Sequence, residues 1–149
     1  MNVRRISRLW VLGAILALGS SVAMAGASPV DVSNARIRLL PGDLPLAGYF
    51  DMHNSGKKAV SLTGASSAAF GMVMIHKSMH KNGEAMMMMV KEIDVAPGKS
   101  VSFAPGGYHL MLMHRKKDLK VGDKVMIELD FSDGQKMNVR FKVSGAGTE

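Results

Sequence analysis

Methionine and histidine side chains are concentrated in one stretch of the chain. There are 14 methionines, and nine of them lie in the stretch from Met72 to His114, together with four of the five histidines. Thioether sulfur and imidazole nitrogen are neutral donors that suit copper(I). Because the sequence contains no cysteine, a blue-copper electron-transfer centre and a Cys-based zinc site are excluded. The composition therefore favours a soft-metal site made of neutral ligands.

Strand periodicity sorts these donors onto faces. Alternate residues of a β-strand point to opposite sides of a sheet. Three sets of side chains share a face in this way: Met72, Met74 and His76; Met87 with Met89, or alternatively Met86 with Met88; and His109, Met111 and Met113. Only one of the two alternating pairs in the run Met86–Met89 can face a given site. His109 and Met111 would lie about 7 Å apart along one strand and can bind one ion together.

Some of these residue types have an ordinary structural use. Methionine is a flexible apolar filler of cores and of adaptable binding surfaces. We favour that packing role for Met72, Met126 and Met137. A lone histidine is usually a surface or hydrogen-bonded residue, and we interpret His53 in this way.

The spacing of four donors follows the signature of a known family. In chain order the donors are His76, Met87, His109 and Met111, separated by ten residues, twenty-one residues and one residue. This order and the string PGGYHLMLM at Pro105–Met113 resemble the H-x10-M-x21-H-x-M signature and the most recognisable segment of the PCu(A)C periplasmic copper chaperones. Three further segments extend the similarity over nearly the whole chain after residue 25: Asn34–Arg38, Ala47–Phe50 and Leu119–Asp123.

The resemblance implies an all-β, cupredoxin-like Greek-key sandwich or barrel that binds one Cu(I). The ligands it implies are His76, Met87, His109 and Met111. It also implies delivery of copper to an acceptor protein, the Cu(A) centre of cytochrome c oxidase subunit II, with Sco-type proteins as further partners. These are expectations from the family and do not follow from composition or spacing.

The sequence departs from the family pattern in two respects. Lys77 stands directly after the first histidine, where the family often has an acidic residue. Additional donors near the motif leave the number of coordinating groups open: His80, Met89, Met113 and His114. The C-terminal tail Ser144–Glu149 has no His or Met of the kind that some relatives use for a second copper, so one site is expected.

Three other classes of protein remain open from the residues. A copper storage or resistance protein would use the same ligands for several ions. A non-metal module would use the methionines as an adaptable protein-binding surface. A copper enzyme needs acid or base groups beside an open site. Because only Glu84 lies beside the cluster in the sequence, we predict that the chain is not an enzyme.

The N-terminus has the pattern of a secretory signal peptide. Arg4, Arg5 and Arg8 precede the apolar run Leu9–Leu18, and small residues follow as far as Ala25. The run is about half of the ~20 residues needed to span a bilayer, so no stable membrane insertion is expected. We predict cleavage of residues 1–25 and a periplasmic location.

Residues 26–149 are expected to form one monomeric domain. These 124 residues suffice for one hydrophobic core. Loss of the three signal arginines lowers the formal charge from +7 to +4. Lys57–Lys58 and Arg115–Lys117 are too sparse, and too poor in aromatic neighbours, for a nucleic-acid surface. We interpret them as solvated side chains, with a docking patch for an acidic partner as the alternative.

The elements that would position the donors are short β-strands. No long stretch has the 3.6-residue period of an amphipathic helix. Nine strands are predicted, at residues 30–39, 47–54, 60–66, 71–80, 85–95, 100–103, 108–113, 124–131 and 136–143. Turn residues separate them, and Ser132–Gly134 between two alternating runs predicts a hairpin. Val125, Ile127, Leu129 and Phe131 are expected to face the core from one side of it.

Overall fold

The computed structural model describes residues 29–147. The predicted signal peptide, residues 1–25, lies outside the described residues. Ten strands are present: β1 (Val30–Arg38), β2 (Leu46–Asn54), β3 (Val60–Ser66), β4 (Phe70–Lys81), β5 (Glu84–Met89), β6 (Ile93–Val95), β7 (Ser100–Phe103), β8 (Tyr108–Arg115), β9 (Lys124–Phe131) and β10 (Lys136–Ser144). Within residues 29–147, no helix has the length and apolar character needed to cross a membrane.

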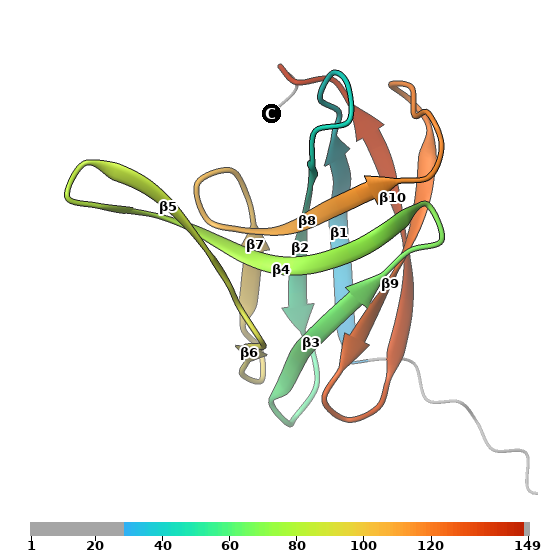
Figure 1. Ribbon diagram of the computed structural model, residues 1–149. Helices are drawn as coiled ribbons and strands as arrows, with labels where there is room; N and C mark the ends of the chain where they lie inside the picture. Colours follow the sequence, from blue (N-terminus) through green and yellow to red (C-terminus); the bar gives the residue numbers. More distant parts are fainter. Residues whose placement is uncertain (1–28, 148–149) are drawn as a thin grey trace, which may run out of the picture.

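The strands form one hydrogen-bonded sheet that folds around a hydrophobic core (Figure 1). The strand order is β5-β4-β8-β7-β2-β1-β10-β9-β3-β6. Stacked rings of Phe50 and Phe103, with centroids 4.2 Å apart, lie in this core, and the edge of Phe141 packs against Phe50 at 5.7 Å. The prediction of an all-β chain is confirmed.

The β9–β10 hairpin has the predicted alternation. Val125, Ile127, Leu129 and Phe131 are all buried, and the two strands pair antiparallel on either side of the turn. Lys136 forms ion pairs across the hairpin with Glu128 at 2.7 Å and Asp130 at 3.0 Å on its exposed face. One face of the hairpin therefore supplies core and the other contacts solvent.

The prediction of a single strand over residues 85–95 is wrong. The chain forms β5 at Glu84–Met89 and β6 at Ile93–Val95, and the two strands lie at opposite ends of the sheet order. Ile93 and Val95 are buried and pair with β3, whereas all of β5 is exposed and pairs with β4. The split occurs because the two segments have different surroundings. The apolar side chains of β6 pack in the core, whereas the hairpin of β4 and β5 extends away from it.

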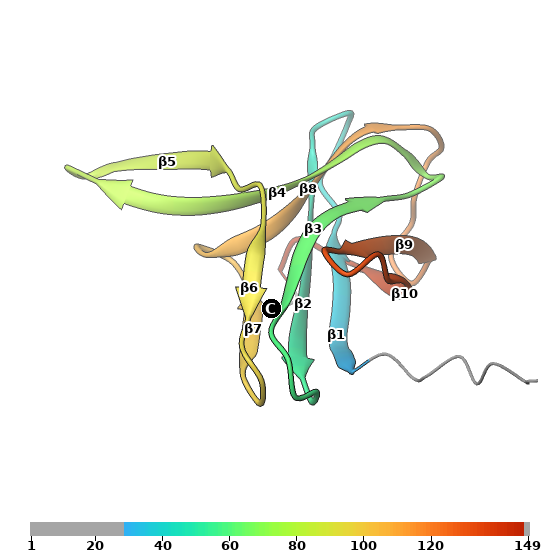
Figure 2. The same cartoon turned by 90° about the horizontal axis from the view of Figure 1, so that it is seen from below.

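A two-residue turn sets the register of the β4–β5 hairpin. Asn82 and Gly83 both have positive φ, 54° and 81°, and Lys81 pairs with Glu84. Positive φ at both central residues is the type I′ requirement, which Asn-Gly meets at low cost. The outer half of the hairpin projects away from the rest of the sheet (Figures 1 and 2).

Replacement of Gly83 by Ala is expected to loosen this hairpin alone. A Cβ at Gly83 meets no atom within 4 Å, so the cost comes from the left-handed backbone and is about 1–2 kcal/mol. Hydrogen exchange of the β4–β5 amides should accelerate roughly tenfold. The matched variant is Gly134→Ala, with φ of 83° and equally open space in the core-forming β9–β10 hairpin. It should lower the global free energy of unfolding. An equal global loss in Gly83→Ala would contradict this prediction.

Candidate metal centre

Two histidines from distant parts of the sequence face each other across the sheet. His76 on β4 pairs directly with His109 on β8. Their ring centroids are 5.9 Å apart and the planes meet at 69°. A metal bonded to one nitrogen of each ring, at about 2.0 Å, would lie roughly 3 Å from each ring centre. The separation therefore suits one shared ion.

Core packing explains why both rings point away from the barrel interior. Ile75 on β4 and Leu110 on β8 pair with each other and are buried in the core. Since side chains alternate along a strand, their neighbours His76 and His109 occupy the other face. The same rule puts Met74 and Met111, which also pair directly, on that face.

The backbone favours one tautomer of His109. This side chain is only 7% exposed, and its Nδ1 lies 3.3 Å from the carbonyl oxygen of Gly107. Because a carbonyl oxygen can only accept, Nδ1 is the donor in this contact, and in the neutral tautomer with the proton on Nδ1 the Nε2 atom has the lone pair that can bind a metal. The N–H of Ser78 donates to the same carbonyl at 3.0 Å, which ties the Pro105–Gly107 loop to β4. The arrangement matches the backbone support usual for metal-binding imidazoles.

Unlike His109, His76 has a ring nitrogen without a hydrogen-bond partner in the described part of the chain. This nitrogen, Nδ1, is buried. Burial of the ring lowers the pKa of His76 below its ordinary value of 6.5, and the nearby His109 lowers it further. The ring is therefore neutral at pH 7, as a metal ligand must be. An unsatisfied buried nitrogen is costly without a partner, so the donor set fits a soft cation.

Methionines from three strands surround this pair. Met89 on β5 pairs directly with His76, and Met87 pairs with Ser78, one step nearer the hairpin tip on the same face. Met111 is diagonal to His76 on β8. We refer to Met74, His76, Met87, Met89, His109 and Met111 as the His/Met face. Met87 and Met89 are 61% and 59% exposed, so its β5 side is open to solvent.

The structure gathers three of the four residues implied by the family signature around one point. His76, His109 and Met111 are direct or diagonal neighbours. Met87 shares their face but lies one pair further out, and Met89 occupies the position across from His76. Because Asn82–Gly83 sets the β4–β5 register, the turn decides which methionine is opposite His76. Alternation had already placed Met74 on this face, although no ligand role was assigned to it.

The remaining predicted donors lie further away. His80 pairs with Ala85 near the hairpin tip, and Met113 pairs with Met72 beyond Met111. His114 is at the far end of β8, where its side chain lies beside Gly71. His53 is hydrogen-bonded to Ser100 Oγ at 2.9 Å, which confirms its interpretation as an ordinary surface residue.

The packing role predicted for three methionines holds for one of them. Met137 packs against the hydrophobic core. Met72 and Met126 are exposed, so the packing prediction is wrong for both. Met72 lies on the outward face of β4, and Met126 lies on the face of β9 that carries Glu128 and Asp130.

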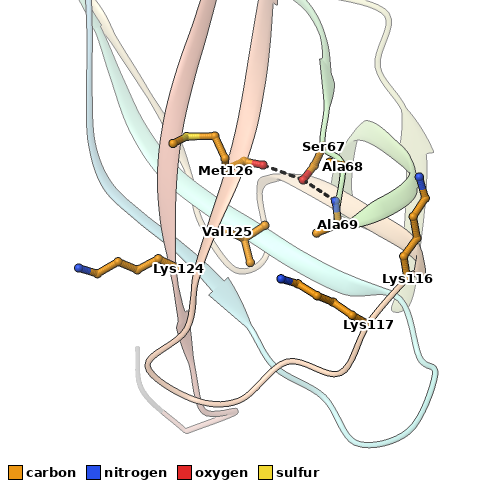
Figure 3. A pocket seen from close by; sticks show the side chains of 8 residues that line it. All are labelled: Ser67, Ala68, Ala69, Lys116, Lys117, Lys124, Val125 and Met126. Carbon is orange, nitrogen blue, oxygen red and sulfur yellow. Dashed lines mark hydrogen bonds between the residues drawn. The ribbon is translucent and has the colours of Figure 1, made fainter.

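A pocket elsewhere on the surface is lined by lysines (Figure 3). Lys116, Lys117 and Lys124 surround it with Met126, whose carbonyl accepts a 2.7 Å hydrogen bond from Ser67 Oγ. No histidine lines this pocket. Over residues 29–147, no three side chains of the His, Cys, Asp and Glu types are grouped closely enough to hold a metal ion.

Comparison with known families identifies the chain. Residues 30–143 match the family model described as "Putative lipoprotein LpqE-like". The chain belongs to the LpqE-like family. A relative from Leifsonia xyli subsp. xyli, "Putative lipoprotein Lxx21020", is 33% identical over 129 residues, which cover 85% of this chain and 77% of that protein. "Uncharacterized protein RP573" of Rickettsia prowazekii is 33% identical over 99 residues, which cover 66% of this chain and 55% of that protein.

Solved structures similar to this LpqE-like chain include PCuAC domains. The solution structure of CuI-DR1885 from Deinococcus radiodurans has a TM-score of 0.65 and 32% identity, covering 82% of this chain and 83% of that one. The copper-bound PCuAC domain from PmoF2 has a TM-score of 0.65 and 24% identity, covering 78% and 93%. The resemblance to the PCu(A)C family and the cupredoxin-like all-β fold class are confirmed by these neighbours.

The environment of His76 makes a testable prediction for the metal-free protein. Followed by NMR, the ring of His76 should titrate with a midpoint below 6.5. In His109→Gln the midpoint should rise part of the way toward 6.5, because one of its two causes is removed. Above pH 6.5 the ring is neutral in both folded and unfolded chains. As the pH falls, the unfolded chain binds the proton first, so His76 should reduce stability progressively through its folded pKa. A midpoint above 6.5 would contradict this account.

Proposed function

We propose that this protein carries one Cu(I) outside the cytoplasm and passes it to an acceptor protein. The observation that carries the proposal is the His76–His109 pair, two imidazole rings that lie edge to face with methionine side chains on the same face of the sheet. The family description as a lipoprotein and the sequence pattern of the N-terminus support a location in the periplasm or cell envelope. The names of the similar structures, one copper-bound and one in the CuI form, support copper as the cargo.

The proposed ligands are His76, Met87, His109 and Met111, as the family signature implies. Met111 and Met87 pair with Met74 and Ser78, on opposite sides of His76 along β4. In a flat sheet they would be about 13 Å apart along the strands and about 10 Å across them. Met87 therefore needs the hairpin to coil over His76. Met89 needs only a side-chain rotation and is the competing fourth ligand.

Release to an acceptor follows from the ligand types. Thioethers and imidazoles are neutral, whereas the cysteine thiolates of an acceptor are negatively charged and soft, and they bind Cu(I) more strongly. The exposed methionines of β5 are the first ligands that an approaching thiolate can replace. By the resemblance, the acceptor is the Cu(A) centre of cytochrome c oxidase subunit II, with Sco-type proteins as partners in the same step.

Loss of a ligand should weaken Cu(I) binding measurably. In anaerobic competition titrations, His109→Ala and Met111→Ala should each lower affinity by at least the roughly 10- to 100-fold seen when an outer partner of a metal ligand is lost. Met126→Leu, an exposed methionine on β9, should leave affinity unchanged. Undiminished affinity in both alanine variants would refute the proposed site.

The same titration assigns the methionine of β5. Leucine keeps the apolar volume of methionine and removes its sulfur, so Met87→Leu and Met89→Leu form a matched pair. The proposed quartet requires the larger loss in Met87→Leu. A larger loss in Met89→Leu would replace Met87 by the residue directly opposite His76.

Transfer of the metal tests the function itself. Copper-loaded protein mixed with a copper-free soluble Cu(A) domain should lose its Cu(I) to that domain. A Cu(A) domain with its cysteines replaced by serine should take up none, because serine offers no soft donor. Retention of copper by the carrier in the presence of the intact domain would contradict the proposed delivery.

A further inference from the structure

The hairpin carries a second group of thioethers that the His/Met face does not use. Alternation sends Met86 and Met88 to the opposite side of β5 from Met87 and Met89. Met79 on β4 shares that side. We propose that Met79, Met86 and Met88 form a second binding site for Cu(I), made of thioethers alone. We call this side the reverse face of the hairpin. This site adds a second ion to the single Cu(I) proposed for the His/Met face, and it is argued independently of that function.

Register places the three sulfur-bearing side chains around one point. Met79 pairs directly with Met86, so their Cβ atoms are about 5 Å apart. Met88 is two residues from Met86 along β5 and diagonal to Met79, and each of these separations is about 7–8 Å. Methionine has three rotatable side-chain bonds and a polarizable sulfur. Three such side chains on one face can converge on a single soft ion.

Packing does not account for these methionines. Met79, Met86 and Met88 are 37%, 49% and 51% exposed. None of them belongs to the hydrophobic core, which the outer part of the hairpin has left (Figure 2). Solvent-exposed strand positions are ordinarily polar, and a cluster of apolar side chains at the end of a projecting hairpin marks a binding site.

The charges around the reverse face fit a monovalent ion. Lys77 pairs with Met88 and lies on the same face, but its ammonium lies 5.0 Å from the ring centre of Tyr108 on β8. This cation–π contact draws it away from β5 and leaves Met88 accessible. At the tip, Glu84 stands opposite Lys81 in the backbone pairing of the two strands, so a positive and a negative side chain flank the turn. With neutral sulfur donors and lysines nearby, the site favours a soft monovalent cation over divalent metals, which prefer nitrogen and oxygen ligands.

Because the reverse face has no imidazole, it is expected to bind Cu(I) more weakly than the His/Met face. The His/Met face has two imidazoles held by the barrel, whereas the reverse face has only thioethers on the free part of a hairpin. Its ligands must lose side-chain freedom on binding, and their backbone support is less rigid. The first equivalent of Cu(I) should therefore fill the His/Met face and the second should fill the reverse face.

Anaerobic titration of the full mature chain, labelled with 13C at the methionine methyl groups, tests the proposal. With Cu(I) as the probe, the methyl signals of Met79, Met86 and Met88 should shift together with the second equivalent. The triple variant Met79→Leu/Met86→Leu/Met88→Leu should bind one ion, with the affinity for the first unchanged. Unchanged amide signals in the metal-free triple variant establish that it is folded. Met126→Leu, an equally exposed methionine on β9, should still bind two ions.

The outcomes of these titrations distinguish failure of this proposal from failure of the proposed function. If His109→Ala loses the first ion but keeps the methyl shifts of the reverse face, the second site stands by itself. A second ion that binds the triple leucine variant as it binds the parent would overturn the proposal. So would a parent that takes up one ion only, or methyl signals of the reverse face that do not move.

Discussion

Strand β4 is hydrogen-bonded on both sides, to β8 along its inner part and to β5 along its outer part, and each donor takes its face from this ladder. Slippage by one residue on either side would transfer a whole set of side chains to the opposite face. Two different constraints prevent it. Ile75 and Leu110 anchor the β4–β8 pairing in the core, and the Asn82–Gly83 turn fixes the β4–β5 pairing. Specific chemistry on an exposed hairpin thus depends on apolar packing on its inner side and turn geometry at its tip.

Local sequence patterns are sufficient to predict most strands and the face on which each side chain lies. They do not predict which strands pair, and only the family resemblance grouped donors from different strands into one site. Alternation put His76 with Met74 and His109 with Met111, because it needs nothing beyond one strand. That His76 and His109 face each other depends on β4 and β8 lying side by side, which no local pattern contains. The split of residues 85–95 was missed for the same reason. Val95 is recognisable as a core residue of a separate strand only when β3 is seen beside it.

The β4–β5 turn is a local feature that determines contacts several residues away. Asn82-Gly83 is visible in the sequence, and a two-residue turn determines every pair along the hairpin. It places Met89 across from His76 and Met87 across from Ser78. The family signature fixes spacing along the chain, which is insensitive to this register. Spacing along the chain and pairing across the sheet therefore favour different ligands on β5. The spacing favours Met87, and the pairing favours Met89.

The two ends of the His/Met face differ in ligand type and in exposure. The imidazoles are at its inner end, where His109 is almost fully buried and the burial of His76 disfavours its protonated form. The thioethers of β5 are at its outer end on the first strand of the sheet order, and they are more than half exposed. An ion held here would keep its rigid nitrogen ligands longest and lose its flexible sulfur ligands first. Since thioethers carry no charge and do not titrate, their replacement by an incoming thiolate requires no proton to be taken up by the carrier, and the added negative charge favours the exchange. For the proposed function, this asymmetry between a buried end and an exposed end would allow one site both to protect a reactive cation and to release it.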